Sequence, residues 1–320
     1  MRLKHVVRGA AWLALVSGLP CASAQMPPPP AEVATPGEEI IVAAPEPRYV
    51  APTLRDRIGR VWAPVYVNGR GPLRLVLDTG ASSSALTAEA AERLGLSLEH
   101  ARKVLLRGVT GAKETSMIDV DRIEVGDLTV EPARLLVIDD AFGGAEGVLA
   151  GRGLGDRRIE IEFRKDHIDI RRSKNQRAPP GFTVLPVKLI RGHVPTVEVV
   201  VGRVHAKAII DTGAQQTTGN LALREALLKR RRLDEQEASI VGVTGDVQEG
   251  PTSDVPPILL NDVVVRNVHM TFVDLHIFEH WDLTSEPTIL IGMDVLGVLD
   301  TLIIDYRRRE LQISLVRGGT

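Results

Sequence analysis

Two similar stretches, LVLDTGASSS at residues 75–84 and AIIDTGAQQT at residues 208–217, decide how this chain is expected to fold. In each, an aliphatic run ends in Asp-Thr-Gly-Ala, which is typical of a buried strand that leads into a tight turn. A single Asp-Thr-Gly would carry little weight, because about one chain in ten of this size has one by chance. Two copies in matching surroundings favour a pair of related turns over two unrelated surface turns. Such turns can bring Asp78 and Asp211 face to face.

The similarity between the two halves extends well beyond these turns. The aspartates are 133 residues apart, and later landmarks keep nearly the same spacing. A repeat of this kind indicates that one structural unit occurs twice. The recurring pairs are Gly-Val-Thr-Gly at 108–111 and 242–245, IEVGDLTV at 123–130 and ILLNDVVV at 258–265, and VLAGRGLG at 148–155 and ILIGMDVLG at 289–297.

Alternating apolar and β-branched residues predict that strands dominate both halves. A helical pattern follows each Asp-Thr-Gly turn, at Thr87–Leu94 and at Leu221–Arg232. Halves with many strands and one helix favour an all-β fold of two β-barrel lobes related by a pseudo-twofold axis. The expected strands are Val65–Val67, Leu73–Leu77, Ile118–Val125, Arg134–Ile138 and Ile159–Ile170 in the first half, and Val184–Leu189, Thr196–Val201, Ala206–Ile210, Pro257–Val265, Val268–Val273 and Leu302–Leu315 in the second.

The first residues are typical of a secretory signal. A basic start at residues 2–8 precedes an apolar run at residues 9–19, which is too short to span a membrane comfortably. Ala-Ser-Ala at residues 22–24 is a typical cleavage site, and the sole cysteine, Cys21, lies before it. We therefore expect an exported, periplasmic protein without disulfides and without a membrane span after cleavage. Whether the signal is cleaved or kept as an anchor stays open.

Shifts in composition predict the domain boundaries. Residues 1–24 form the signal, and the Pro- and Glu-rich residues 25–52 are expected to be a disordered tether. The remaining chain of about 270 residues is ample for two lobes. We place these lobes at residues 53–172 and 183–320, with residues 173–182 as the linker between them.

Composition also argues against several classes of function. A formal net charge of −2 and an aromatic content of 3% do not favour a nucleic-acid partner. The neighbouring residues His269, His276 and His280 lack the cysteines or the H-E-x-x-H pattern of a zinc site. We expect neither a metal nor a cofactor, and the roles of the three histidines stay open.

The order of motifs resembles that of the retropepsin-like aspartic proteases. It is similar in particular to bacterial single-chain forms, in which two retropepsin units are fused, and the resemblance covers residues 55–316. It implies that Asp78 and Asp211 are a catalytic pair that activates water to hydrolyse peptide bonds of an extended polypeptide. Because one chain carries both turns, it also implies a monomer.

The same resemblance implies roles for the residues around the pair. Thr79 and Thr212 would interlock their hydroxyls beneath the aspartates, and Gly80 and Gly213 would allow a close backbone approach. Ser82 and Gln215, four residues after each aspartate, would contact the substrate. Two glycine hairpins would form flaps over the substrate, with Gly108, Val109, Thr110 and Gly111 in one and Gly242, Val243, Thr244 and Gly245 in the other.

Three features depart from an even, pepsin-like pattern. Ala81 and Ala214 replace the hydroxyl residues of pepsins, so we expect the pair to titrate higher and activity to peak at roughly pH 4–6. Ser82 and Gln215 differ between the halves, which predicts an asymmetric binding groove. The first half lacks a counterpart of Asp294, so we expect that lobe to be looser at the corresponding segment.

A different class of function is also compatible with this fold. The chain could be a peptide-binding module with weak or absent turnover, because a fold does not determine a function. The presence of both aspartates and both threonines favours the enzyme. A purely structural envelope protein would leave the paired motifs unexplained.

Overall fold

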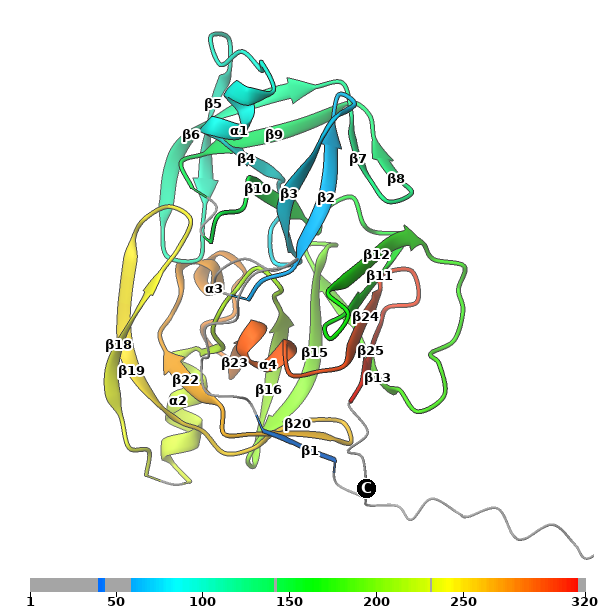
Figure 1. The fold of residues 1–320 in the computed structure, drawn as a ribbon. Helices are drawn as coiled ribbons and strands as arrows, with labels where there is room; N and C mark the ends of the chain where they lie inside the picture. The colour runs from blue at the N-terminus through cyan, green and yellow to red at the C-terminus, as the bar shows by residue number, and fades with distance from the viewer. Residues whose placement is uncertain (1–39, 44–58, 141–142, 231, 316–320) are drawn as a thin grey trace, which may run out of the picture. The chain divides into compact units, whose positions relative to one another are not determined.

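The computed structural model describes residues 40–43, 59–140, 143–230 and 232–315, with the backbone alone for 40–43. Within these residues the chain forms twenty-five strands and four short helices (Figure 1). The strands belong to three sheets, one for each lobe and a third to which both lobes contribute. The prediction of an all-β fold with two related lobes is confirmed.

The first lobe is built on a nine-stranded sheet with the order β5-β6-β9-β4-β10-β3-β2-β7-β8. Helix α1 (Ala88–Arg93) follows β4, and the Thr87 side chain caps it by accepting a hydrogen bond from the Ala90 amide. The strands are β2 (Trp62–Val67), β3 (Arg70–Asp78), β4 (Ala85–Thr87), β5 (Arg102–Arg107), β6 (Ala112–Val120), β7 (Ile123–Val125), β8 (Leu128–Val130), β9 (Ala133–Ile138) and β10 (Gly147–Ala150).

The second lobe repeats this plan in an eleven-stranded sheet. Its helices are α2 (Leu221–Leu228), α3 (His276–His280) and α4 (Met293–Leu296). Its strands are β1 (Ile40–Ala43), β14 (Lys188–Ile190), β15 (Val194–Val201), β16 (Val204–Ile210), β17 (Thr218–Gly219), β18 (Gln236–Val241), β19 (Val247–Asp254), β20 (Ile258–Leu260), β21 (Val263–Arg266), β22 (His269–Phe272) and β23 (Thr288–Ile291).

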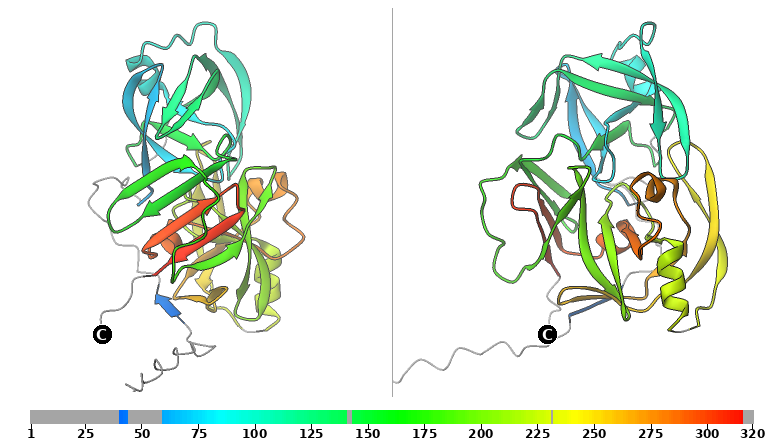
Figure 2. Two further views of the ribbon diagram at one scale, coloured as in Figure 1. Left: turned by 90° about the vertical axis from the view of Figure 1, so that its right-hand side faces the viewer. Right: turned by 180° about the vertical axis from the view of Figure 1, so that it is seen from behind.

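The third sheet joins the lobes. It has the order β12-β11-β24-β25-β13, and β11 from the first half pairs with β24 from the second half. Figure 2 shows these two hairpins side by side in its left view. The strands are β11 (Arg157–Glu162), β12 (His167–Arg172), β13 (Thr183–Pro186), β24 (Thr301–Asp305) and β25 (Glu310–Ser314).

Alternation along β3 explains how the first aspartate reaches the site. Leu73, Leu75 and Leu77 are buried in the apolar core that both lobes share. Successive side chains of a strand point to opposite faces, so Val76 and Asp78 lie on the other face. In β16 the same alternation buries Ala208 and Ile210 in that core and places Ile209 on the opposite face, which Asp211 continues. Both carboxyls therefore point away from the core that the lobes share.

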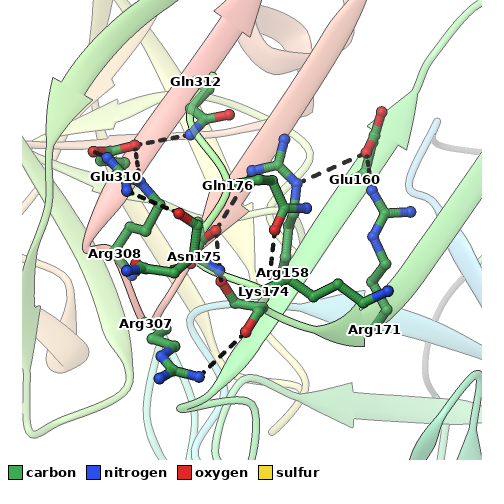
Figure 3. A network of polar contacts seen from close by, with 12 residues as sticks. Arg158, Glu160, Arg171, Lys174, Asn175, Gln176, Arg307, Arg308, Glu310 and Gln312 are labelled. Atoms are coloured by element: carbon green, nitrogen blue, oxygen red, sulfur yellow. Dashed lines mark hydrogen bonds and ion pairs between the residues drawn. The ribbon is translucent and has the colours of Figure 1, made fainter. Parts of the chain in front are cut away.

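A buried ion pair lies in the shared sheet where the linker begins. Arg158 on β11 and Asp305 on β24 have side chains that are 2% and 0% exposed, with Nη1 and Oδ2 3.4 Å apart. The Ser173 hydroxyl donates to the same Asp305 oxygen at 2.9 Å. Figure 3 shows the surrounding contacts, in which Arg307 donates to the Ser173 carbonyl and Arg308 to the Asn175 carbonyl. These contacts attach the first residues of the linker to the shared sheet.

Several expected strands are in fact two strands joined by a turn. The prediction of single strands was wrong at four places, namely Ile118–Val125, Ile159–Ile170, Pro257–Val265 and Leu302–Leu315. At three of the turns a residue has positive φ, and the sequence pattern does not show this: Asp166 at 48°, Asn261 at 59° and Arg309 at 54°. Polar residues interrupt the apolar pattern at these turns, as at Asn261–Asp262 and Arg307–Arg309, so the prediction of single strands overlooked a turn signal.

Two further differences concern the ends of elements and the tether. Helix α2 ends at Leu228, so the helix expected over Leu221–Arg232 is shorter than predicted. Within the segment expected to be disordered, β1 pairs in parallel with β21, and Ile40 lies opposite Val263. The expectation of disorder is therefore wrong for residues 40–43, and the rest of the tether and the signal lie outside the described residues.

Candidate active site

The two Asp-Thr-Gly turns are locked together by their threonines. The Thr79 hydroxyl donates to the Ile210 carbonyl at 2.6 Å, and the Thr212 hydroxyl donates to the Leu77 carbonyl at 2.7 Å. Each threonine amide also donates to the hydroxyl oxygen of the other threonine, at 3.3 and 3.2 Å. Neither side chain is accessible to solvent. All four hydrogen bonds connect the two halves of the chain.

Glycine is required at the third position of both turns. A Cβ on Gly80 would lie 2.8 Å from Oδ2 of Asp211, and one on Gly213 would lie 2.3 Å from Cγ of Asp78. Real Cβ atoms do not approach other atoms so closely, so any side chain there would displace the opposite carboxyl. Each turn therefore packs its backbone against the aspartate of the other half.

Backbone amides fix the orientation of both carboxyls. The amides of Gly80 and Ala81 donate to Oδ1 of Asp78 at 2.9 and 2.8 Å. In the second half, the amides of Gly213 and Ala214 donate to Oδ1 of Asp211 at 2.9 and 3.2 Å. The alanines thus supply an amide donor where pepsins also have a hydroxyl.

The two carboxyls are not electrically equal. Burial raises the pKa of Asp78, while the amide of Ala81 and the charge of Arg60 counteract this rise. Burial and the negative charge of Asp78 raise the pKa of Asp211 well above its ordinary value. When two carboxyls are this strongly coupled, the titration belongs to the pair. Burial raises the pKa of both carboxyls, and they titrate as one coupled pair.

The two glycine hairpins meet at their tips, between β5 and β6 and between β18 and β19 (Figure 1). The hydroxyl oxygens of Thr110 and Thr244 are 3.4 Å apart, and both residues are buried. A Cβ on Gly108 would lie 3.0 Å from the Thr244 methyl carbon, and one on Gly242 would lie 2.3 Å from the Thr110 hydroxyl. The flap glycines allow this close contact.

A valine at each tip packs against the opposite lobe. Val243 of the second half joins the first-lobe cluster that contains Trp62 and Val76. Val109 of the first half joins the second-lobe cluster that contains Ile209 and Phe278. Val76 and Ile209 share a sheet face with the aspartates that follow them, so each flap tip packs on the face that carries the aspartate of the opposite lobe.

The connection between β22 and β23 in the second lobe contains helix α3, which contacts the first flap. The Ile277 amide, at the start of α3, donates to the Val109 carbonyl at 3.4 Å. Sequence periodicity did not predict α3, because five residues are too few to show a helical pattern. The expected substrate contacts Ser82 and Gln215 are both solvent-exposed and lie in their turns beside the pair.

Asp294 supports the second turn through Thr217. Its carboxylate accepts hydrogen bonds from the Thr217 hydroxyl at 2.7 Å and the Thr217 amide at 3.0 Å, and burial raises its pKa. The Thr217 oxygen accepts in turn from the Gly292 amide at 3.1 Å. In the first half Ser84 accepts from the Ala150 amide at 3.0 Å, without a carboxylate behind it. The first lobe, which we expected to be looser here, therefore keeps a hydrogen bond from a backbone amide to the hydroxyl of its turn.

Two buried residues near the pair were not singled out from the sequence. Arg60 is 6% exposed and donates to the Gly213 carbonyl at 3.5 Å. The Tyr306 hydroxyl is buried without a hydrogen-bond partner among the described residues. Burial and the charge of Asp78 raise the pKa of Tyr306, so this hydroxyl stays protonated. Neither residue belongs to a short motif, and only the three-dimensional fold brings them to the site.

The three histidines take part in local contacts. His269 lies 3.0 Å from the Asp254 carboxylate and His276 lies 3.8 Å from that of Glu279, while burial and Arg191 lower the pKa of His280. Across the part of the chain that the structure describes, no group of three or more His, Cys, Asp or Glu side chains could hold a metal ion.

A family model described as aspartyl protease matches the chain twice, at residues 63–155 and 197–295. The chain belongs to the aspartyl protease family. Each match contains one Asp-Thr-Gly turn and one flap, which agrees with two fused retropepsin-like halves. A comparison with curated proteins gave no match. The family acts on polypeptides, and none of the described helices is long and apolar enough to cross a membrane.

The threonine interlock leads to the first prediction. Thr212→Val removes the donor to the Leu77 carbonyl and the acceptor of the Thr79 amide, both of which are buried. We expect the free energy of unfolding to fall by about 1–3 kcal/mol for each group left unsatisfied. Thr212→Ser keeps the hydroxyl and is the matched control. Urea denaturation measures both variants, and equal stability of the valine and serine variants would contradict the account.

Burial of Asp211 leads to a prediction about pH and stability. A carboxyl with a raised pKa keeps its proton in the folded state at pH values where the unfolded chain has lost it. Stability therefore decreases as the pH rises from near the ordinary value of 3.8 through the folded pKa. Asp211→Asn removes this effect but keeps the shape. We expect its melting temperature to exceed that of the wild type by more at pH 7 than at pH 4, and a constant difference would contradict this.

Proposed function

We propose that this protein is an aspartic endopeptidase that hydrolyses peptide bonds within an extended polypeptide. The observation that carries the proposal is the pair of carboxyls, one from each half, that the interlocked turns hold together, with Asp211 buried and Asp78 partly exposed. Two carboxylates about 3 Å apart repel each other by roughly 5 kcal/mol at an effective dielectric near 20, so one of them holds a proton. Such a pair can supply an acid and a base at once.

The proposed reaction needs only this pair and a water molecule. The Asp78 carboxylate takes a proton from the water, whose oxygen attacks the scissile carbonyl carbon. The Asp211 carboxyl donates its proton to the carbonyl oxygen, and a tetrahedral diol forms. Transfer of a proton to the peptide nitrogen then breaks the carbon–nitrogen bond and gives an acid and an amine. Each general acid or base contributes typically 10²–10⁴-fold.

The two flaps support a polypeptide as the substrate. An extended peptide between the flaps and the aspartates could form backbone hydrogen bonds on both sides, as an added strand does. The tips are in contact with each other, so they must separate to admit a peptide. We propose that the apolar clusters that contact Val109 and Val243 receive the side chains next to the scissile bond.

The remaining parts of the proposal concern the protein as a whole. We propose that it acts as a monomer, because one chain supplies both aspartates, and that it is exported to the periplasm, because of its N-terminal signal. Burial raises the pKa of both aspartates, which supports activity in mildly acidic conditions. A peptide-binding module without turnover remains the competing function.

Mutation of each aspartate separates the two functions. We expect Asp78→Asn and Asp211→Asn each to lower kcat/KM on a peptide by at least 10³-fold, because neither half supplies both the acid and the base. Circular dichroism would confirm that the variants fold. Asp119→Asn, on the exposed end of β6, is the matched control and should cleave normally. Cleavage by either active-site variant at a tenth of the wild-type rate would contradict the proposal, and absence of cleavage by the wild type would favour the binding module.

A further inference from the structure

The residues that precede the two aspartate hairpins are equivalent in position but different in charge. Arg60 lies 18 residues before Asp78, and His193 lies 18 residues before Asp211. Arg60 comes just before β2 and His193 just before β15, the first strands of the hairpins that lead to the aspartates. Both residues are 6% exposed. The pseudo-twofold axis therefore relates a permanent cation to an imidazole.

Arg60 reaches the pair through the turn of the other half. Its guanidinium donates to the Gly213 carbonyl at 3.5 Å, and Gly213 packs directly against the Asp78 carboxyl. The guanidinium therefore lies beside the turn that packs against Asp78, in a buried place where a charge is poorly screened. Its positive charge lowers the pKa of Asp78. The strongest influences on the pKa of Asp211 are burial and the negative charge of Asp78, both of which raise it.

His193 does not supply a matching charge. Its Nδ1 lies 3.0 Å from the Arg191 carbonyl, and burial together with Arg152 and Arg191 lowers its pKa. The ring is therefore neutral at neutral pH, whereas an arginine stays charged throughout. The strongest side-chain influences on the pKa of Asp78 are the charge of Arg60 and a hydrogen bond with Asp211, and the Tyr306 hydroxyl stays protonated. Arg60 is thus the cation that distinguishes the two sides.

We propose that Arg60 is a positioning residue that makes the pair unequal, keeping Asp78 as its ionised member and leaving the shared proton on Asp211. This inference rests on the proposed function and adds a physical reason why Asp78 is the base and Asp211 the acid. It assigns the difference to one buried guanidinium outside the Asp-Thr-Gly motifs. The sequence of the turns does not predict it, because both turns read Asp-Thr-Gly-Ala.

The first test is the pH profile of kcat/KM on a peptide substrate. In Arg60→Gln the amide keeps a hydrogen-bond donor for the Gly213 carbonyl but has no charge. We expect the half-maximal point on the acidic side to move up by roughly half to one pH unit, because the base loses its nearby cation. Arg60→Lys keeps the charge and should stay close to the wild-type profile. Arg122→Gln, which removes an exposed arginine, is the control and should not shift it.

A second measurement needs neither substrate nor turnover. Aspartate labelled with ¹³C at the carboxyl reports each titration by NMR in the intact chain, and Asp78→Asn and Asp211→Asn assign the signals. We expect the Asp78 signal to titrate at higher pH in Arg60→Gln than in the wild type. An unchanged Asp78 titration, or equal shifts in the glutamine and lysine variants, would overturn the proposal.

The same measurement remains decisive if Arg60→Gln does not fold. With Arg60 in place, Asp78 in the Asp211→Asn variant should titrate at lower pH than Asp211 does in the Asp78→Asn variant. Equal titrations would overturn the proposal. Absence of hydrolysis by the wild type would instead count against the proposed function, and the NMR titrations would still test the role of Arg60.

Discussion

The structure depends on the hydrogen bonds that Thr79 and Thr212 exchange across the two halves. Each hydroxyl satisfies a buried backbone carbonyl that precedes the aspartate of the other half, and accepts from the other threonine amide. Buried polar groups without partners are costly, so neither turn is stable in this form without the other. This interaction therefore requires both lobes to fold around a common centre.

The chemistry of the site follows from the same constraint. Locking the turns brings each glycine against the opposite carboxyl and holds the two aspartates together, with Asp211 buried and Asp78 partly exposed. Burial then raises the pKa of both carboxyls, and the negative charge of Asp78 raises that of Asp211 further. The flaps also make contacts between the halves, since Val109 and Val243 each pack on the lobe that does not carry them. Stability is thus reduced at the place where an acid and a base are needed together.

The parts of the fold that could be predicted from sequence are those with short motifs and a regular spacing. The apolar runs before Asp78 and Asp211 and the repeat between the halves predict the two lobes and the two turns. The turn at Asn261 was missed although Asn261–Asp262 interrupts the apolar run, and helix α3 could not be predicted because five residues are too few to show a helical pattern. Arg60 was missed for another reason: its role depends on a contact with Gly213, which is 153 residues away in the sequence.

The central claim is that one chain folds into one complete site. Titration of the mature protein with a peptide analogue that carries a hydroxyl in place of the scissile carbonyl tests it most directly, because such a group binds between the two carboxyls. Calorimetry should give one analogue bound per chain, with the same affinity at every protein concentration and loss of binding in Asp78→Asn. One analogue per two chains, or binding that persists in Asp78→Asn, would contradict the account.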